Sequence, residues 1–400
     1  MKHLLEIHIL QNFAPSNLNR DDTGSPKDAI FGGYRRARIS SQSLKRAMRE
    51  YVRDNPNGLS QEATAIRTKR LVQELVRQLI DRGRPEDEAL QKVTLALGGM
   101  GLKVGEENKT QYLLFVGRQE VKKIAELIHD HWNSLVAGQA EEEGGKKKAK
   151  DLKRAAREAV SAEIKKALSQ VLDGGKAVDV ALFGRMLADL PEKNQDAACQ
   201  VAHAISTNAV EREFDFYTAV DDLKPDDTSG ADMLGTVEFN SACFYRYAAL
   251  DLQQLHKNLQ GDTELMFKGL EAFLRAMVKA KPSGKQNSFA AHNDPEYVVL
   301  TVRQEADPRS LANAFEKPAR HSRDLRLTEA SAVKFEQKWR WLEEAYNQAG
   351  TTFRLNDPEL DGADFRRKGE EKAERVGVMV RNLEDLILKT LEAARKAMGV

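Results

Sequence analysis

Apolar and polar residues alternate at the start of the chain, in MKHLLEIHIL, and this pattern predicts a strand over residues 4–10. A long polar loop rich in Asn, Asp, Gly, Ser and Pro is expected to follow as far as Gly33. From Ser41 to about Asp54, apolar residues recur at spacings of three and four, which is typical of a helix with one buried face. Ser40 is suited to cap this helix, because its hydroxyl can accept hydrogen bonds from the amides of the first turn.

Residues 60–170 are expected to be mostly helical, because four segments have apolar residues at spacings of three and four. These segments are TKRLVQELVRQLIDRG, PEDEALQKVTLAL, VKKIAELIHDHWNSLVAG and AEIKKALSQVL. Between the last two lies EEEGGKKKAKDLKR (141–154), which is typical of a solvated loop leading into a basic helix.

Strand patterns return in the second half of the chain, in VEFNSACFYRYAAL (237–250) and YVVLTVR (297–303). Between them, TELMFKGLEAFLRAMVKA (263–280) has helical spacing. From about Ala330 the pattern is helical again, interrupted by the polar AGTTFRLNDPELDGADF. Because the strands do not alternate evenly with helices, this order predicts an α+β core of antiparallel strands with helical additions.

The bulk composition narrows the class of protein. A chain of 400 residues is too long for one compact core, so two or three structural units are expected. Its two cysteines, Cys199 and Cys243, form neither a disulfide framework nor a metal-ligand cluster, which favours a reducing, cytoplasmic setting. The N-terminus lacks the features of a signal peptide, and no uncharged apolar run is long enough to cross a bilayer, so no membrane partner is expected.

Charge is almost balanced over the whole chain, with 62 Lys and Arg against 61 Asp and Glu. A polyanionic partner must therefore be bound by a local patch. Such a basic patch occurs in FGGYRRARISSQSLKRAMRE (31–50), whose only acid is Glu50. On a helical wheel, its helix divides into an apolar face of Leu44, Ala47, Met48 and Tyr51 and a polar face of Gln42, Lys45, Arg46, Arg49 and Arg53.

Two interpretations of this basic patch are open. A solvated cationic face is the common explanation of such a cluster. Binding of a phosphate backbone explains more of the features, because Gly32 and Gly33 permit close backbone approach and a capped helix start favours a phosphate. Lys45 and Arg49 lie four residues apart and repel one another in an isolated helix, and an anionic partner turns that repulsion into attraction.

Six segments carry a specific resemblance. They are HILQNFAPSNLNRDDTGSPKDAIFGGYRRARISSQSLKRAMR (8–49), DVALFGRM (179–186), VAHAISTNAVEREFDFYTAVDDL (201–223), LGTVEFNSACFYRYA (234–248), PSGKQNSFAAHNDPE (282–296) and SLANAFEKP (310–318). Together they resemble the CasC-type backbone subunit of type I-E CRISPR Cascade complexes, a RAMP-superfamily protein. The segments follow the family's order over residues 1 to about 320, whereas residues 60–175 and those after 325 match only in helical character.

The resemblance implies an α+β fold with a modified RRM (ferredoxin-like) palm, formed by residues 1–58, 179–205 and 241–324. It also implies a helical fingers insertion (59–178), a thumb β-hairpin (206–240) and a helical C-terminal part (325–400). Family members stack head to tail along a CRISPR RNA, and each thumb kinks one base out of line. The implied partners are CRISPR RNA, target DNA, further copies of the chain and other Cascade subunits, with sequence read by base pairing.

The resemblance further implies that guide phosphates are contacted by Lys27, Ser40, Gln42, Ser43, Lys45 and Arg49. Met186 matches a wedge against the kinked nucleotide, and Leu234 lies near the thumb tip. To the RNA-binding set we add three further cations of the basic patch, Arg35, Arg38 and Arg46, and Lys285 of the SGKQ loop (283–286). Target DNA is expected to meet Lys146, Lys147, Lys148, Lys150, Lys153 and Arg154.

Alternative explanations stay open for several of these residues. Taken alone, Met186 and Leu234 have the character of core residues. Three thumb aromatics are expected to be packing residues, with stacking on RNA bases as the alternative. They are Phe214, Phe216 and Tyr217. The SGKQ loop is explained almost as well by a simple turn, and the basic run 146–154 by a solvated tract.

Catalytic motifs are absent from the sequence, which contains no HExxH, Walker A, GxSxG or metal-spaced Cys/His set. Candidate histidines are His3 and His8 on the first strand and His203 within an expected helix. The acids of NRDD (19–22), FDF around Asp215 and AVDD (219–222) are the candidates for holding a metal.

The resemblance decides between these functions. Related CRISPR backbones of other complex types cut RNA with a loop aspartate, so a RAMP-type endoribonuclease is the alternative. The subunit resembled here does not cut, and we therefore expect no enzyme activity, no cofactor and no metal. A helical scaffold without nucleic acid conflicts with the basic patch.

Overall fold

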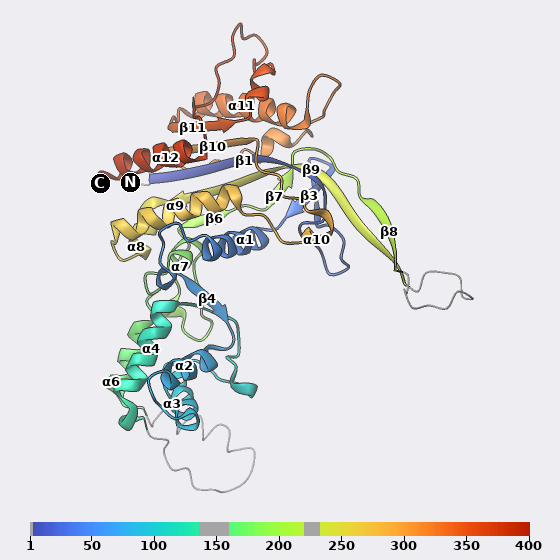
Figure 1. Ribbon diagram of the computed structural model, residues 1–400. Coiled ribbons are helices and arrows are strands. Elements are labelled where there is room, and N and C mark those ends of the chain that lie inside the picture. Colours follow the sequence, from blue (N-terminus) through green and yellow to red (C-terminus); the bar gives the residue numbers. More distant parts are fainter. Residues whose placement is uncertain (1–2, 136–159, 220–232) are drawn as a thin grey trace, which may run out of the picture. The chain divides into compact units, whose positions relative to one another are not determined.

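The computed structural model describes residues 3–135, 160–219 and 233–400, with the side chains of residues 219, 233 and 234 left out (Figure 1). Two compact units are present. The sheet unit comprises Met1–Asn55, Cys199–Gln253 and Leu270–Val400, and the helical unit comprises Pro56–Ala198 and Gln254–Gly269.

The sheet unit is built on a ten-stranded sheet with the order β12-β11-β10-β1-β9-β7-β3-β2, in which β6 and β8 also pair with β9. Its strands are β1 (His3–Ser16), β2 (Asp28–Phe31), β3 (Tyr34–Ile39), β6 (Cys199–Val201), β7 (Ala204–Ser206), β8 (Glu213–Ala219), β9 (Met233–Asp251), β10 (Tyr297–Gln304), β11 (Thr351–Asn356) and β12 (Val378–Met379). Pairing is antiparallel except between β11 and β12. The predicted α+β class with antiparallel strands is therefore confirmed.

The central strand β1 is longer than its alternating pattern predicts. It pairs with β9 on one side and β10 on the other, and a register shift between Phe13 and Ser16 lets it continue into the expected loop. The expected loop also contains β2, which forms a hairpin with β3 across Gly32 and Gly33. Both glycines have positive φ angles, 61° and 82°, which a tight two-residue hairpin turn requires.

Helices cover both faces of the sheet (Figure 1). On one face, α11 (Leu327–Tyr346) packs its Phe335 against the Tyr245 and Tyr297 rings. On the other, Arg246 of β9 donates to the Met277 carbonyl of α9 (Thr263–Lys279) at 2.5 Å. Successive residues of a strand point to opposite faces, so β9 supplies both cores. The remaining helices of the sheet unit are α1 (Ser41–Asp54), α10 (Gln286–Phe289), α12 (Leu383–Met398), η5 (Ala312–Phe315) and η6 (Pro358–Gly362).

The C-terminal region is only partly the helical part that the resemblance implies. α11 and α12 are helical, but the polar interruption between them contains β11, which extends the sheet by pairing with β10. Its residues TTFRLN alternate exposed or half-buried with buried positions, a strand pattern that the neighbouring Gly, Asn and Pro residues obscure in the sequence.

The helical unit has its own apolar core, formed mainly by leucine, isoleucine and valine residues of its helices. Its helices are α2 (Leu71–Ile80), α3 (Glu86–Gly99), α4 (Arg118–Asp130), α6 (Ala162–Val171), α7 (Val178–Phe183), η1 (Gln61–Ala63), η2 (Glu106–Asn108), η3 (Trp132–Ser134) and η4 (Pro191–Lys193). A small sheet joins β4 (Ala65–Thr68) to β5 (Leu114–Gly117). α8 (Leu252–Asn258) and α9 each contribute residues to both units.

No helix among the described residues has the combination of length and apolar character that a membrane span needs.

Candidate nucleic-acid interface

The basic patch folds into β3 and α1, as its pattern predicts. Ser40 has extended backbone angles (φ −68°, ψ 145°), and its Oγ accepts from the Ser43 amide at 3.2 Å, which confirms the predicted cap. Leu44, Ala47 and Met48 are buried, so the apolar face packs inward. The helix start is therefore held firmly, and its polar face is presented outward.

The polar face of α1 carries four cations in different settings. Gln42 and Arg46 are exposed, whereas Ser43, Lys45 and Arg49 are half-buried. Arg46 pairs with Glu50 at 2.8 Å, and Arg53 pairs with Asp54 at 2.9 Å. Exposed pairs of this kind contribute little energy, about 0–1 kcal/mol, so an anionic ligand can displace the carboxylate at small cost.

The arginines of β3 have three different roles. Arg36 is buried, and its guanidinium donates to the carbonyls of four residues, Ser206, Thr207, Phe315 and Glu316. Arg35 is exposed and pairs with Asp28 at 2.7 Å. Arg38 is half-buried, donating from Nε to the Asp28 carbonyl. Arg36 thus fixes the β2–β3 hairpin, while Arg35 and Arg38 remain near the surface.

Asn19 brings three predicted RNA ligands together. Its Oδ1 accepts from the Ser40 amide at 2.8 Å, and its carbonyl accepts from the Lys27 amide at 2.8 Å. The Lys27 carbonyl in turn accepts from the Arg38 amide at 2.9 Å. Lys27, Arg38 and Ser40 are therefore neighbours, although the first lies in the polar loop before β2.

His203 lies against this group, which we call the His203 cluster (Lys27, Arg38, Ser40 and His203). The sequence predicted a helix here, but His203 lies between the short strands β6 and β7, so that prediction was wrong. Both strands pair with β9, and such distant pairing overrides local helical spacing. Partial burial, then the charges of Arg38 and Lys27, lower the pKa of His203.

The SGKQ loop packs against the segment that contains Asn19. A Cβ atom on Gly284 would lie 2.3 Å from the Leu18 carbonyl oxygen, so only glycine permits this approach. Lys285 follows with a left-handed backbone (φ 51°) and is half-buried at the start of α10. The loop is thus more than a simple turn, because Gly284 packs directly on the backbone of Asn17 and Leu18.

The predicted thumb is a two-stranded hairpin of β8 and the first part of β9, which extends away from the rest of the sheet unit (Figure 1). Phe214 and Phe216 are 60% and 71% exposed, so the expectation that they pack in the core was wrong. Tyr217 lies over Gly235, which has no side chain to prevent it. Leu234 lies in β9 opposite Thr218.

Ion pairs connect the base of this hairpin to β2. Arg212 donates to Asp28 at 2.9 Å and to Glu238 at 3.1 Å, and Asp28 also accepts from Arg35. Sequence reasoning missed Asp28 and Arg212, because 184 residues separate them and no local pattern links them.

Met186 belongs to the helical unit and is 79% exposed, which contradicts the core alternative. The preceding residue, Arg185, is buried and pairs with Glu120 at 2.8 Å. A firmly held Arg185 fixes the backbone from which Met186 extends. The six predicted DNA contacts, Lys146, Lys147, Lys148, Lys150, Lys153 and Arg154, lie outside the described residues.

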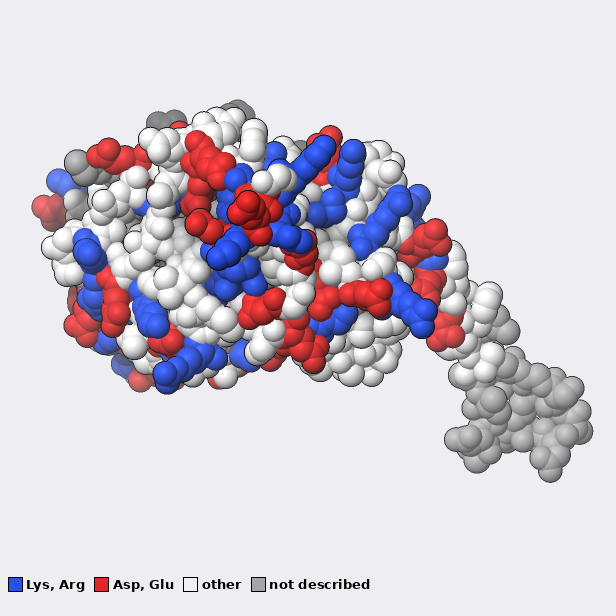
Figure 2. Space-filling view, turned by 90° about the horizontal axis from the view of Figure 1, so that it is seen from above, with Lys and Arg blue, Asp and Glu red and all other residues white. Residues whose placement is uncertain are grey.

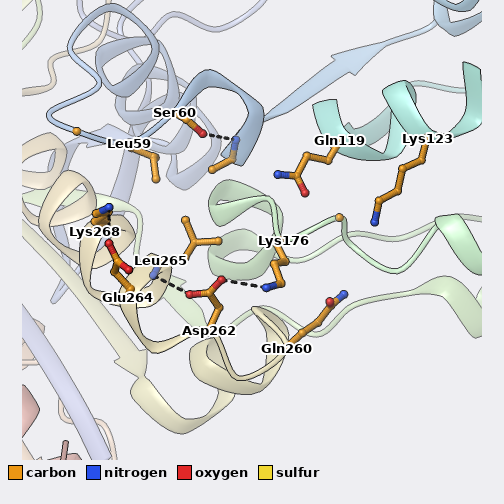
Figure 3. A pocket seen from close by; sticks show the side chains of 13 residues that line it. Leu59, Ser60, Gln119, Lys123, Lys176, Gln260, Asp262, Glu264, Leu265 and Lys268 are labelled. Atoms are coloured by element: carbon orange, nitrogen blue, oxygen red, sulfur yellow. Dashed lines mark hydrogen bonds and ion pairs between the residues drawn. The ribbon is translucent and has the colours of Figure 1, made fainter. Parts of the chain in front are cut away.

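A cavity of about 480 Å³ opens in the helical unit beside η1 and the start of α4 (Figure 3). Three lysines line it, Lys123, Lys176 and Lys268. Lys176 pairs with Asp262 at 2.9 Å and Lys268 with Glu264 at 2.7 Å. Because carboxylates balance two of the three charges, the cavity does not extend the cationic surface. Lys and Arg also interleave with Asp and Glu on the face shown in Figure 2.

Among the acidic residues proposed for metal binding, Asp21 is engaged in local structure, whereas Asp215 is exposed. Asp21 accepts from Thr23 and Ser25, and the Thr23 hydroxyl is the main reason why the pKa of its carboxyl is lowered. Asp215 lies in β8 opposite Val237. Among the described residues, no three His, Cys, Asp or Glu side chains are grouped to hold a metal. Asp221 and Asp222 lie outside the described residues.

The fold and the cationic surface define an α+β protein with a candidate phosphate-binding face and a projecting hairpin. The chain belongs to the family described as CT1975-like protein (Cas_CT1975), whose model matches residues 5–382.

Solved structures give a closer comparison. A chain of a structure titled "CRISPR RNA-guided surveillance complex, pre-nicking" is 29% identical, with a TM-score of 0.80 over 98% of this chain and 100% of that chain. A chain of a second structure, titled "CRISPR RNA-guided surveillance complex", is 25% identical, with a TM-score of 0.68 over 98% and 99%. None of the curated proteins compared is similar enough to match.

Proposed function

We propose that the protein is a non-catalytic, CRISPR RNA-binding backbone subunit of a type I-E Cascade surveillance complex that acts in antiviral defence. The observation that carries this proposal is a set of contacts at residues 17–19. Asn19 binds the backbone amides of Ser40 and Lys27, the Lys27 carbonyl binds the Arg38 amide, and Gly284 packs on the neighbouring Leu18. The similarity to chains of RNA-guided surveillance complexes over almost the whole length supports it.

In this proposal the sheet unit supplies the palm, the helical unit supplies the fingers and the β8–β9 hairpin is the thumb. Copies of the chain bind head to tail along the guide, because a contact between two different faces continues as a helix when it does not close into a ring. Each thumb displaces one base at a regular interval. Met186 acts as a wedge against a displaced nucleotide, and Leu234 lies near the tip of the thumb. The lysine-rich run at 146–154 helps to bind target DNA by charge.

Charge reversal on α1 tests the proposed phosphate contacts. We expect Lys45→Glu with Arg49→Glu to weaken binding of single-stranded RNA equally for unrelated sequences. Each phosphate contact contributes about 0.7 to the slope of log affinity against log salt, so the slope should fall by about 1.4. The measurement is fluorescence anisotropy of labelled RNA over a salt series.

A matched control is available in the sheet unit. Lys368 and Lys372 are exposed, also four residues apart, and lie between η6 and β12. Lys368→Glu with Lys372→Glu makes the same change in net charge and should leave the salt slope unchanged. Equal losses in both double variants would show that only net charge matters, and unchanged affinity in the α1 variant would refute the assignment.

Among the acids considered for cutting RNA, Asp21 gives the endoribonuclease alternative no support, because Thr23 and Ser25 hold its carboxylate. Our proposal requires that RNA recovered with the purified protein is intact and stays intact with added divalent metal.

A further inference from the structure

His203 has an unusual partner for a surface histidine. The Nη1 atom of Arg38 lies 3.1 Å from its Nδ1. A guanidinium can only donate, so Nδ1 must be the acceptor and the neutral imidazole carries its proton on Nε2. The strand register puts Ile39 opposite Ala204, and Ser40 therefore lies close to His203 at the capped start of α1.

Cations dominate the surroundings of this imidazole. Arg38 comes from β3 and Lys27 from the segment before β2. Lys45 of α1 is also near, because its charge acts on the pKa of Cys199 in the adjacent strand β6. On β2, which pairs with β3, the Asp28 carboxylate is already shared by Arg35 and Arg212. The pKa of His203 is lowered by burial and by Arg38 and Lys27, and no carboxylate raises it.

We propose that His203 is a further ligand of an RNA phosphodiester and that it takes up one proton when the RNA binds. The phosphate attracts the Arg38 guanidinium, which releases Nδ1. Solvent then supplies a proton to Nδ1, and the imidazolium donates to a phosphate oxygen. This inference rests on the proposed function, and it adds a charge that exists only in the complex.

The proton uptake makes binding depend on pH. In the free protein, partial burial and then the charges of Arg38 and Lys27 keep the pKa of His203 below its usual value near 6.5, and a bound phosphate raises it. RNA affinity should therefore rise as the pH falls through the pKa of the complex, and level off below the pKa of the free protein. Each pKa unit between the free protein and the complex raises the RNA affinity by a factor of about ten. The slope of log affinity against pH should not exceed one, because a single proton is taken up.

The test is a pH series from about 8 to about 6 at constant ionic strength, with labelled single-stranded RNA and four proteins. The full chain should gain at least about fivefold in affinity at low pH. His203→Gln should keep the weaker affinity at every pH. His203→Lys, which carries a permanent charge, should bind tightly at every pH. His321→Gln, another exposed histidine of the sheet unit, should behave as the unaltered chain.

Each outcome decides the question. Flat binding in His203→Gln and His203→Lys, with a pH response in the unaltered chain and in His321→Gln, supports the inference. A full pH response in His203→Gln, or none in the unaltered chain, overturns it while the proposed function stands. Absence of RNA binding by the unaltered chain at every pH overturns the proposed function itself.

Discussion

The buried ion pair between Glu120 and Arg185 holds the helical unit together at one point. Both side chains are almost fully shielded from solvent. Both Glu120 oxygens accept from Arg185 Nη1 at 2.8 Å, and they also accept from the amides of Gly117 at 2.7 Å and Gly174 at 2.9 Å. Glu120→Gln keeps the shape of the side chain but removes its charge, which leaves a guanidinium buried without a counter-charge.

The expected loss of stability follows from this geometry. Removing one partner of a buried ion pair costs about 3–5 kcal/mol, because the remaining charge stays desolvated. The glutamine oxygen still accepts a hydrogen bond from the amide of Gly117 or Gly174. The hydrogen bonds that are lost therefore cost less free energy than the unpaired charge does. Domains are stable by only about 5–15 kcal/mol, and the variant should therefore fold with a much reduced margin.

Hydrogen exchange followed peptide by peptide can measure this loss in the helical unit alone. We expect amides of α4 to exchange with an opening free energy lower by about 3–5 kcal/mol in Glu120→Gln, whereas β1 and β10 are unaffected. Glu126→Gln is the control, because the Glu126 carboxylate lies on the same helix, 3.8 Å from Arg82, and is half exposed. It should cost less than about 0.5 kcal/mol. A loss below about 1 kcal/mol in Glu120→Gln would refute the reasoning.

Two further predictions concern the proposed RNA surface. Phe214→Ser with Phe216→Ser should change the free energy of unfolding by less than about 0.5 kcal/mol, because both rings are exposed. The same double variant should abolish the regular protection of bound RNA against nuclease. An unchanged protection pattern would contradict the thumb assignment. Gly284→Ala forces a Cβ to within 2.3 Å of the Leu18 carbonyl oxygen, so it should lower the free energy of unfolding by about 1–3 kcal/mol and weaken RNA binding. The control is Gly362→Ala, whose Cβ meets no atom within 4 Å and should leave thermal unfolding unchanged.

Local signals predicted the parts of the interface that depend on neighbouring residues. Ser40 and the apolar residues Leu44, Ala47 and Met48 specify the start and orientation of α1 within a few turns of chain, and the structure agrees. The alternating pattern of residues 4–10 likewise predicts β1, although it does not show that both faces of the strand are buried, with Glu6 and His8 as polar residues of the interior.

Pairing between distant segments could not be read in the same way. Arg36 has the appearance of one more surface cation, and only the carbonyls of residues 206–207 and 315–316 make it a buried structural residue. The sequence placed His203 in a helix, because the strands β6 and β7 on either side of it form by pairing with the distant β9. Phe214 and Phe216 are exposed because β8 extends away from the rest of the sheet unit, and no local sequence pattern predicts that extension.

The contacts of Arg36 have a consequence for biosynthesis. The hairpin that carries Arg35 and Arg38 is fixed by the Arg36 guanidinium, which binds the carbonyls of Phe315 and Glu316. These two residues are made 279 and 280 residues later than Arg36. β1 also waits for β9 and β10 to complete its sheet. Since non-local pairing forms slowly, the surface proposed to bind RNA matures only after β9, β10 and residues 315–316 have been made, and a nascent chain should bind RNA only after that point.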